Sequence, residues 1–448
     1  MRAEIRSEET NVFPRLLDLA YPNVDRGEGV RLYTVDGREI LDACSGGAMV
    51  ACLGHGVDEI VDAAAAQAER ISYVYNHHFT NDREQEYADR LLEVAAPEMA
   101  RVRFVSGGSE ANETALRLAR QYHVERGDEE RWRVISPAQS YHGATMGALA
   151  LTGRPSIHGH YAEYLPGHVH IPPATSRRDP TGEASLAALD EAIEEAGPET
   201  IAAFMCEPVS GAALPAYTPP EAFWVGLAER AQRHGFLIVF DEIVAGMGRT
   251  GAWFASHDLP IEPDIFSAGK GMGAGYVPLA AAFCKQHVYE AIEQGSRLFD
   301  LGHTWDGAPL PCAVGLAVLE HLQANLLVER VRERGPSLRD ELEQALAGSE
   351  IVGEVRGRGF LLGVELVDPR DGASPLPIEI DAAEMVDQTA FDHGVLVTSS
   401  HSTPDGFTGE QTLLSPAYNA TDDDLEAMLE RFASAISDVE DRVKELLV

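Results

Sequence analysis

Short apolar segments alternate with helical segments through the middle of this chain. VRFV leads into the helix-like EANETALRLAR, and the apolar runs WRVIS, IAAFMCEPV, FLIVFDEIV, DIFSAG and LAAAFC follow in order. Stretches of helical composition, such as LAALDEAIEEA and EAFWVGLAERAQRHG, lie between several of these runs. Strands that alternate with helices are typical of a parallel sheet covered on both faces. The sequence therefore predicts an α/β fold with a mainly parallel sheet.

The length of the chain predicts more than one core. It has 448 residues, and single hydrophobic cores stop growing at roughly 250–300 residues. Near the C-terminus GEVRGRGFLLGVELV resembles two strands, which indicates a second, α+β domain. Thr421 and the three aspartates after it predict the start of a final helix, because a threonine N-cap and an acidic first turn stabilise that end.

The charge balance excludes some classes of partner. The chain has 72 acidic and 35 basic residues, a formal net charge of -37, and its lysines are Lys270, Lys285 and Lys444. So acidic a surface repels nucleic acid and anionic membranes. It fits an ordinary acidic cytosolic enzyme or adaptation to high salt, where screening over about 3 Å at 1 M removes self-repulsion. The scarcity of lysine favours high salt.

Several features predict a cytoplasmic protein. The N-terminal MRAEIRSEET has no apolar core of a signal peptide, and no apolar run approaches the roughly 20 residues of a membrane span. The five cysteines form no C-x-x-C pair and are interpreted as small apolar core residues in a reducing compartment.

Three motifs resemble ligand sites but lack the required context. GMGRTG, residues 246 to 251, matches a dinucleotide-binding loop, but it does not lie directly between a strand and a helix. Gly269 and Lys270 resemble part of a P-loop, but Gly271 stands where serine or threonine is needed. His77 and His78 are adjacent and point in different directions, so the sequence predicts no metal site.

Two segments predict a desolvated amine beside a carboxylate. VFDEI ends an apolar strand at Asp241 and Glu242, and an acid there faces the interior only if it is paired. DIFSAGKGMG places Lys270 among glycines after another apolar strand, where desolvation would make its amine a nucleophile. Lys270 follows Asp241 by 29 residues, so both can lie at one edge of a parallel sheet. Solvated acids and an extended surface lysine remain the alternatives.

Two further segments predict contacts with a flat anionic ligand. In SGGSEANETALRLAR, a glycine turn, a hydroxyl and helix N–H groups suit an anion at Gly108 and Ser109, although simple helix capping also explains the pattern. In SYHGAT, Tyr141 suits stacking on a ring and His142 suits a hydrogen bond to it, although loop packing explains them too.

Together these segments resemble the class III aminotransferases, which belong to the fold type I pyridoxal-phosphate enzymes. DEIVAGMGRTG followed by PDIFSAGKGMGAGYVPLAA is highly specific for that family, and SGGSEANETALRLAR, YHGAT, EPV and HTWDGAPLPCAVGLAVL match in the expected order. The resemblance covers nearly the whole chain. It implies a large cofactor-binding domain at residues 57–322 and a smaller α+β domain built from residues 1–56 and 323–448.

The resemblance also implies a role for each matching position. Lys270 would hold pyridoxal 5'-phosphate as a Schiff base and move a proton between substrate Cα and cofactor C4′. Asp241 would keep the pyridine nitrogen protonated, so that the ring acts as an electron sink. The other expected cofactor contacts are Gly108 and Ser109 at the phosphate, Ile243 under the ring, Tyr141 and His142 at the ring, and Thr304 at the phosphate of the partner subunit in a homodimer.

The implied reaction is ping-pong transfer of an amino group from an amine donor to a keto acid acceptor. Glu207 matches a carboxylate near the substrate, but the tail SSHSTPDGFTGEQTLLSPAYNAT lacks the arginine that binds an α-carboxylate in many relatives. Either Arg154 replaces that arginine, or the donor is an ω-amino acid or a terminal amine, which we favour. An aminomutase or a decarboxylating transaminase of the same fold is the alternative reaction, and a non-catalytic cofactor-binding protein is the alternative class.

Overall fold

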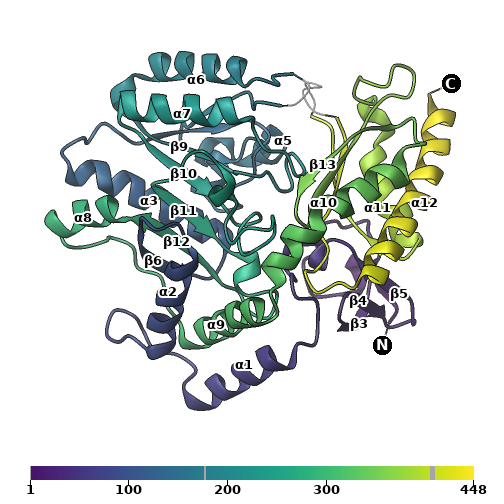
Figure 1. Cartoon of the computed structure of the whole chain (residues 1–448), viewed down its shortest axis with the longest axis horizontal. Coiled ribbons are helices and arrows are strands. Elements are labelled where there is room, and N and C mark those ends of the chain that lie inside the picture. The colour runs from purple at the N-terminus through teal and green to yellow at the C-terminus, as the bar shows by residue number, and fades with distance from the viewer. Residues whose placement is uncertain (1, 176–177, 404–408, 448) are drawn as a thin grey trace.

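A seven-stranded sheet forms the centre of the larger lobe and confirms the predicted α/β fold (Figure 1). The computed structural model describes residues 2–175, 178–403 and 409–447. Neighbouring strands follow the order β6–β12–β11–β10–β9–β7–β8. β12 runs antiparallel to both of its neighbours, and the other pairs are parallel. The strands are β6 (Met99–Val105), β7 (Arg133–Pro137), β8 (Val169–Ile171), β9 (Ile201–Cys206), β10 (Leu237–Asp241), β11 (Ile265–Ala268) and β12 (Ala280–Lys285).

The central strands are largely apolar because helices cover both faces of the sheet, and Asp241 of β10 and Ser267 of β11 are polar exceptions. Alternate side chains point to opposite faces: Val239 packs in the cluster that includes residues of α3, whereas Phe240 contacts Trp224 of α7 with ring centroids 5.4 Å apart. Around the sheet lie α1 (Asp58–Arg70), α2 (Asp82–Val94), α3 (Gly108–Glu125), α4 (Met146–Leu151), α5 (Pro155–His158), α6 (Glu183–Ala196), α7 (Glu221–His234), α8 (Gln286–Gln294) and α9 (Pro309–Ala324).

The ends of two neighbouring strands place the predicted amine and carboxylate at one edge of the sheet. β10 and β11 are parallel, and Asp241 pairs in register with Ser267. Lys270 follows β11 by two residues. Asp241 and Lys270 lie at the same edge because one connection and one strand separate them in the sequence.

Segments from both ends of the chain form the smaller lobe (Figure 1). A four-stranded sheet in the order β15–β5–β4–β3 joins β15, from the C-terminal part, to three N-terminal strands. A second sheet, in the order β13–β14–β17–β16, is antiparallel. The remaining strands and α-helices are β1 (Glu4–Ile5), β2 (Tyr21–Pro22), β3 (Val24–Glu28), β4 (Arg31–Thr34), β5 (Glu39–Asp42), β13 (Val352–Arg358), β14 (Leu361–Leu366), β15 (Val395–Leu396), β16 (Thr398–Ser400), β17 (Gln411–Leu414), α10 (Leu327–Leu346), α11 (Ala382–Asp392) and α12 (Asp422–Leu446).

The final helix begins where the sequence predicts. The hydroxyl of Thr421 accepts a hydrogen bond from the backbone N–H of Asp424 at 3.1 Å. The Asp424 carboxylate accepts one in return from the N–H of Thr421 at 3.0 Å, which completes a capping box. The apolar stripe of α12, which includes Leu425, Met428 and Phe432, is buried.

The junction between α9 and α10 lies close to the expected domain boundary. α9 ends at Ala324 and α10 begins at Leu327, and their axes bend by 60°. The expected boundary after residue 322 falls in the last turn of α9. Among the described helices none is both long and apolar enough to cross a membrane by itself, and the α9–α10 pair meets those criteria only when its two bent halves are combined.

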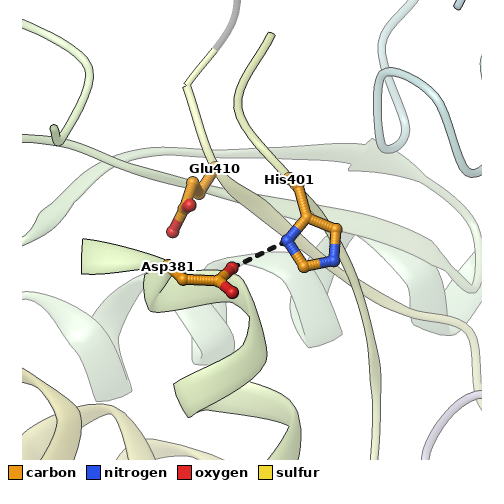
Figure 2. Close-up of side chains that lie close together, drawn as sticks. All are labelled: Asp381, His401 and Glu410. Carbon is orange, nitrogen blue, oxygen red and sulfur yellow. Dashed lines mark hydrogen bonds and ion pairs between the residues drawn. The ribbon is translucent and has the colours of Figure 1, made fainter. Parts of the chain in front are cut away.

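Three polar side chains meet where α11 begins (Figure 2). Their potential ligand atoms lie within 4.8 Å of one another. The buried Glu410 carboxylate, just before β17, accepts a hydrogen bond from the N–H of Ala383 at 2.6 Å, so it caps the start of α11. His401 and Asp381 form a 2.8 Å ion pair, and both side chains are about half exposed. A helix cap and a surface pair therefore account for the cluster.

These two contacts predict different costs on mutation. Glu410→Leu leaves the N–H of Ala383 without an acceptor and should destabilise the start of α11 by about 1 kcal/mol. His401→Ala removes only an exposed ion pair and should cost less than about 1 kcal/mol. Amide hydrogen exchange of peptides from α11 measures both effects. Faster exchange in His401→Ala than in Glu410→Leu would contradict this assignment.

Candidate active site

The buried carboxylate of Asp241 is held by three hydrogen bonds. Its Oδ2 accepts from Nδ1 of His142 at 2.8 Å and from Nδ2 of Asn112 at 2.7 Å. Its Oδ1 accepts from the backbone N–H of Ile243 at 3.0 Å. Because an ionised carboxylate only accepts, these contacts place a proton on Nδ1 of His142. The site thus holds a desolvated carboxylate in one orientation, with acceptor capacity remaining on Oδ1.

A second set of hydrogen bonds fixes the groups that hold Asp241. Asn112 also donates to the carbonyl of His142 at 2.6 Å and accepts from Oγ of Ser267 at 2.5 Å. The backbone N–H of His142 donates to Oγ1 of Thr152 at 2.9 Å. Sequence reasoning missed Asn112, Ser267 and Thr152. The available signal for Ser267 was a single polar residue within the apolar strand segment IFSA, whereas Asn112 lies among other polar residues in EANETA and has no such signal.

The start of α3 can hold an anion. Gly107 precedes the helix, and a side chain there would meet no atom within 4 Å. Oγ of Ser106 is buried and has no hydrogen-bond partner among the residues that the structure describes, and Oγ of Ser109 accepts from the N–H of Ala144 at 3.0 Å. Free N–H groups at a helix start attract phosphate. The space, the unpartnered hydroxyl and the helix terminus fit the phosphate of a cofactor.

Ile243 connects residues 106–109, called the anion loop below, to the Asp241 site. A Cβ at Gly108 would lie 3.1 Å from Cγ2 of Ile243, so the isoleucine side chain packs directly on the helix start. A Cβ at Gly269, the residue before Lys270, would lie 3.0 Å from Cδ1 of the same side chain. The structure therefore brings Gly108, Ile243 and Lys270 into one compact region.

Lys270 carries an amine suited to nucleophilic chemistry. Its backbone has φ of 42°, and among the described residues Nζ has no hydrogen-bond or ion-pair partner. Burial lowers the pKa of the ammonium group to about 8, although the Asp241 carboxylate acts in the opposite direction. A substantial fraction of the amine is therefore neutral near pH 8.

Glu207, Tyr141 and Arg154 lie together beside this region. The buried Glu207 carboxylate accepts from the N–H of Tyr141 at 3.2 Å and from the N–H of Gly211 at 2.8 Å. Burial raises the pKa of Glu207. Burial is the main cause of the lowered pKa of the half-buried Arg154, and the positive charge of Arg15 lowers this pKa further. Tyr141 and Glu207 act in the opposite direction. In the described part of the chain Arg154 forms no ion pair.

Thr304 stands apart from the other predicted residues. It is exposed, its carbonyl accepts from the hydroxyl of Tyr73 at 2.8 Å, and the adjacent Trp305 is 54% exposed. No described contact joins it to the site in its own chain.

The second acid of VFDEI, Glu242, is buried beside Asp241 in the sequence. Its carboxylate accepts hydrogen bonds from the N–H groups of Ala255 and Ser256 at 2.6 and 2.8 Å.

Comparison with known proteins agrees with this geometry. The family description "Aminotransferase class-III" matches residues 17–436. The uncharacterized aminotransferase YodT of Bacillus subtilis is 33% identical, over 96% of this chain and 98% of its own length. Gamma aminobutyrate transaminase 2 of Solanum lycopersicum is 30% identical, over 96% and 94%.

A solved structure is similar over the same extent. The amine transaminase of an uncultivated Pseudomonas species, in its PLP-bound form, is 32% identical with a TM-score of 0.88, and the match covers 97% of this chain and all of that one. The family match spans both lobes and includes Asp241 and Lys270. This chain therefore belongs to the class III aminotransferase family.

Proposed function

We propose that this aminotransferase binds pyridoxal 5'-phosphate at the edge of the sheet formed by β10 and β11. The observation that carries the proposal is the buried Asp241 carboxylate, fixed by three donors in the same region as an unpaired Lys270 amine. The start of α3 would hold the phosphate through Gly108 and Ser109. Tyr141 and Ile243 would lie against the two faces of the ring.

The cofactor, when bound, supplies an electron sink that acidifies the Cα–H bond of an attached amine. Asp241 would hold a positive charge on the pyridine nitrogen, and its buried position strengthens that interaction. His142 and Asn112 would keep the carboxylate in place. Lys270 would be the covalent attachment point, and its neutral Nζ would accept the proton from substrate Cα.

The acceptor is a keto acid, and the full cycle is ping-pong. An aminomutase or a decarboxylating transaminase would use the same residues, but stoichiometry separates them: transamination consumes one keto acid per amine and releases no CO₂. Retention of Lys270, Asp241 and Ser109 in one compact site argues against a non-catalytic cofactor-binding protein.

The proposed active unit is a homodimer. Thr304 is exposed beside the exposed Trp305, and its hydroxyl makes no hydrogen bond among the described residues, which supports a position at the phosphate of the partner subunit. We retain the domain limits 1–56, 57–322 and 323–448, a cytoplasmic location and adaptation to high salt as further proposals. The net charge of -37 supports the last of these.

The proposed donor is an ω-amino acid or a terminal amine. A half-buried arginine without an ion pair is a ready partner for a carboxylate, and Arg154 lies near Glu207 and Tyr141. It would bind a carboxylate remote from the reacting carbon. The tomato relative is named for gamma-aminobutyrate, which is an ω-amino acid.

The Lys270 site predicts an unusual titration. In cofactor-free enzyme, acylation of Lys270 should have its pH midpoint at about 8, because burial lowers its pKa. Lys444 is an internal reference, since its hydrogen bonds to Glu440 and Glu350 raise its pKa. Peptide mapping by mass spectrometry gives both midpoints. Equal midpoints for the two lysines would show that Lys270 is not perturbed.

Matched donors test the proposed function and the role of Arg154. Wild-type enzyme should use 4-aminobutanoate with a keto acid acceptor, and Lys270→Ala should have no activity. Arg154→Gln should lower kcat/KM for 4-aminobutanoate by about 10- to 100-fold, the cost of about 1.5–3 kcal/mol for a hydrogen bond to a charged group. Butylamine, which lacks the carboxylate, should be unaffected by the substitution.

The order of amine donors by kcat/KM can contradict the proposed donor class. If alanine or another α-amino acid has the highest kcat/KM and terminal amines are poor donors, the ω-donor proposal is wrong. If no amine supports transfer to any keto acid, the proposed reaction itself fails.

A further inference from the structure

A cleft of about 360 Å³ lies where three separate parts of the chain meet. Thr250 comes from the loop after β10, Arg332 and Arg339 from α10, and Arg358 from the end of β13. Figure 1 shows α10 between the two lobes. None of these four residues belongs to the site around Asp241, so the cleft is a separate feature of the fold.

The cleft concentrates positive charge in a strongly acidic protein. The whole chain has 35 basic residues against 72 acidic ones. The lining of the cleft reverses that ratio, with three guanidinium groups and one carboxylate, that of Asp258. Neighbouring cations repel one another, so an anion bound between them would relieve that repulsion.

The three arginines have donors to spare. Arg358 is half-buried, and its side chain makes no hydrogen bond or ion pair within the described part of the chain. Arg332 donates from Nε to the carbonyl of Gly251 at 2.6 Å, and its terminal nitrogens have no partner within the described residues. Among the described residues Arg339 pairs only with the adjacent Asp340, at 2.8 Å, in an exposed ion pair that contributes little to stability.

A buried hydroxyl at the same place also lacks a partner. Thr250 is 6% exposed, and its Oγ1 forms no hydrogen bond with any described residue. A buried polar group without a partner costs about 1–3 kcal/mol, so it indicates a missing ligand, ion or water. This observation is independent of the arginines, because it comes from the larger lobe.

Direct backbone contacts make the walls of the cleft rigid. A Cβ at Gly251 would lie 2.6 Å from Cα of Arg332, and one at Gly335 would lie 2.5 Å from Cα of Gly359. Glycine is therefore required for α10 to approach both the loop and the β13–β14 turn. Arginines presented from a fixed frame lose less freedom when they bind.

We propose that this cleft binds a multivalent oxyanion of the phosphate type through Thr250, Arg332, Arg339 and Arg358. Guanidinium groups bind phosphate oxygens through paired hydrogen bonds, and the threonine hydroxyl donates one more. The bound anion bridges α10, the loop after β10 and the β13–β14 turn. It thereby stabilises the junction between the lobes without entering the active site.

Calorimetric titration of the cofactor-loaded enzyme with inorganic phosphate tests the proposal. Loaded enzyme is used because the cofactor then fills the anion site at α3. Wild type should bind one phosphate per chain at this cleft. Thr250→Val and Arg358→Gln should each weaken binding by about tenfold or more, since each removes a donor to a charged group.

Two controls separate the cleft from general charge effects. Arg370→Gln removes one exposed positive charge that pairs with Asp368 elsewhere, and it should leave phosphate affinity unchanged. Thr250→Val should not lower the melting temperature in phosphate-free buffer, because the lost hydroxyl has no partner. A phosphate monoester that displaces phosphate identifies an ester as the occupant, whereas an ester that fails to displace it identifies free phosphate.

Several results would overturn the proposal. They are the absence of saturable phosphate binding in wild type, unchanged affinity in both Thr250→Val and Arg358→Gln, and an equal loss in Arg370→Gln. Because none of these measurements uses turnover, they are independent of the proposed transamination.

Discussion

The Asp241 carboxylate is the group on which the rest of the site depends. It is 4% exposed, and a charge so far from water is stable only when hydrogen bonds and a positive partner compensate for lost hydration. His142, Asn112 and the N–H of Ile243 supply the hydrogen bonds. Among the described residues, no lysine or arginine forms an ion pair with it. A pyridinium nitrogen would supply the missing charge.

The fold explains why these groups meet. Parallel β10 and β11 end side by side, so the residues that follow them share one edge of the sheet. α3 begins near the same edge. Asn112, in its first turns, donates to Asp241, and the anion loop lies at its N-terminus. Ile243 packs on both Gly108 and Gly269, and a Cβ at either position would crowd its side chain. Sheet order and close backbone packing therefore position the chemistry.

Part of this arrangement was predictable from the sequence, and part was not. The neighbouring positions of Asp241 and Lys270 follow from strand spacing alone. Asn112 and Ser267 were missed because their contact requires knowing that α3 lies across β11, which no local pattern specifies. The direction of β12 was not predictable, since a short apolar run is alike in both orientations. The capping role of Glu410 was not predictable either, because the helix that it caps begins 28 residues before it in the sequence.

The most direct test of the account is Asp241→Asn. Asparagine keeps the shape of the side chain but cannot hold a charge on the pyridine nitrogen. Lys270 should still bind the cofactor covalently, as borohydride reduction and mass spectrometry would show. The value of kcat should fall by about 100- to 1,000-fold, the usual effect of losing one preorganised electrostatic contact. A variant that retains kcat within a few-fold of wild type would contradict the central role of this carboxylate.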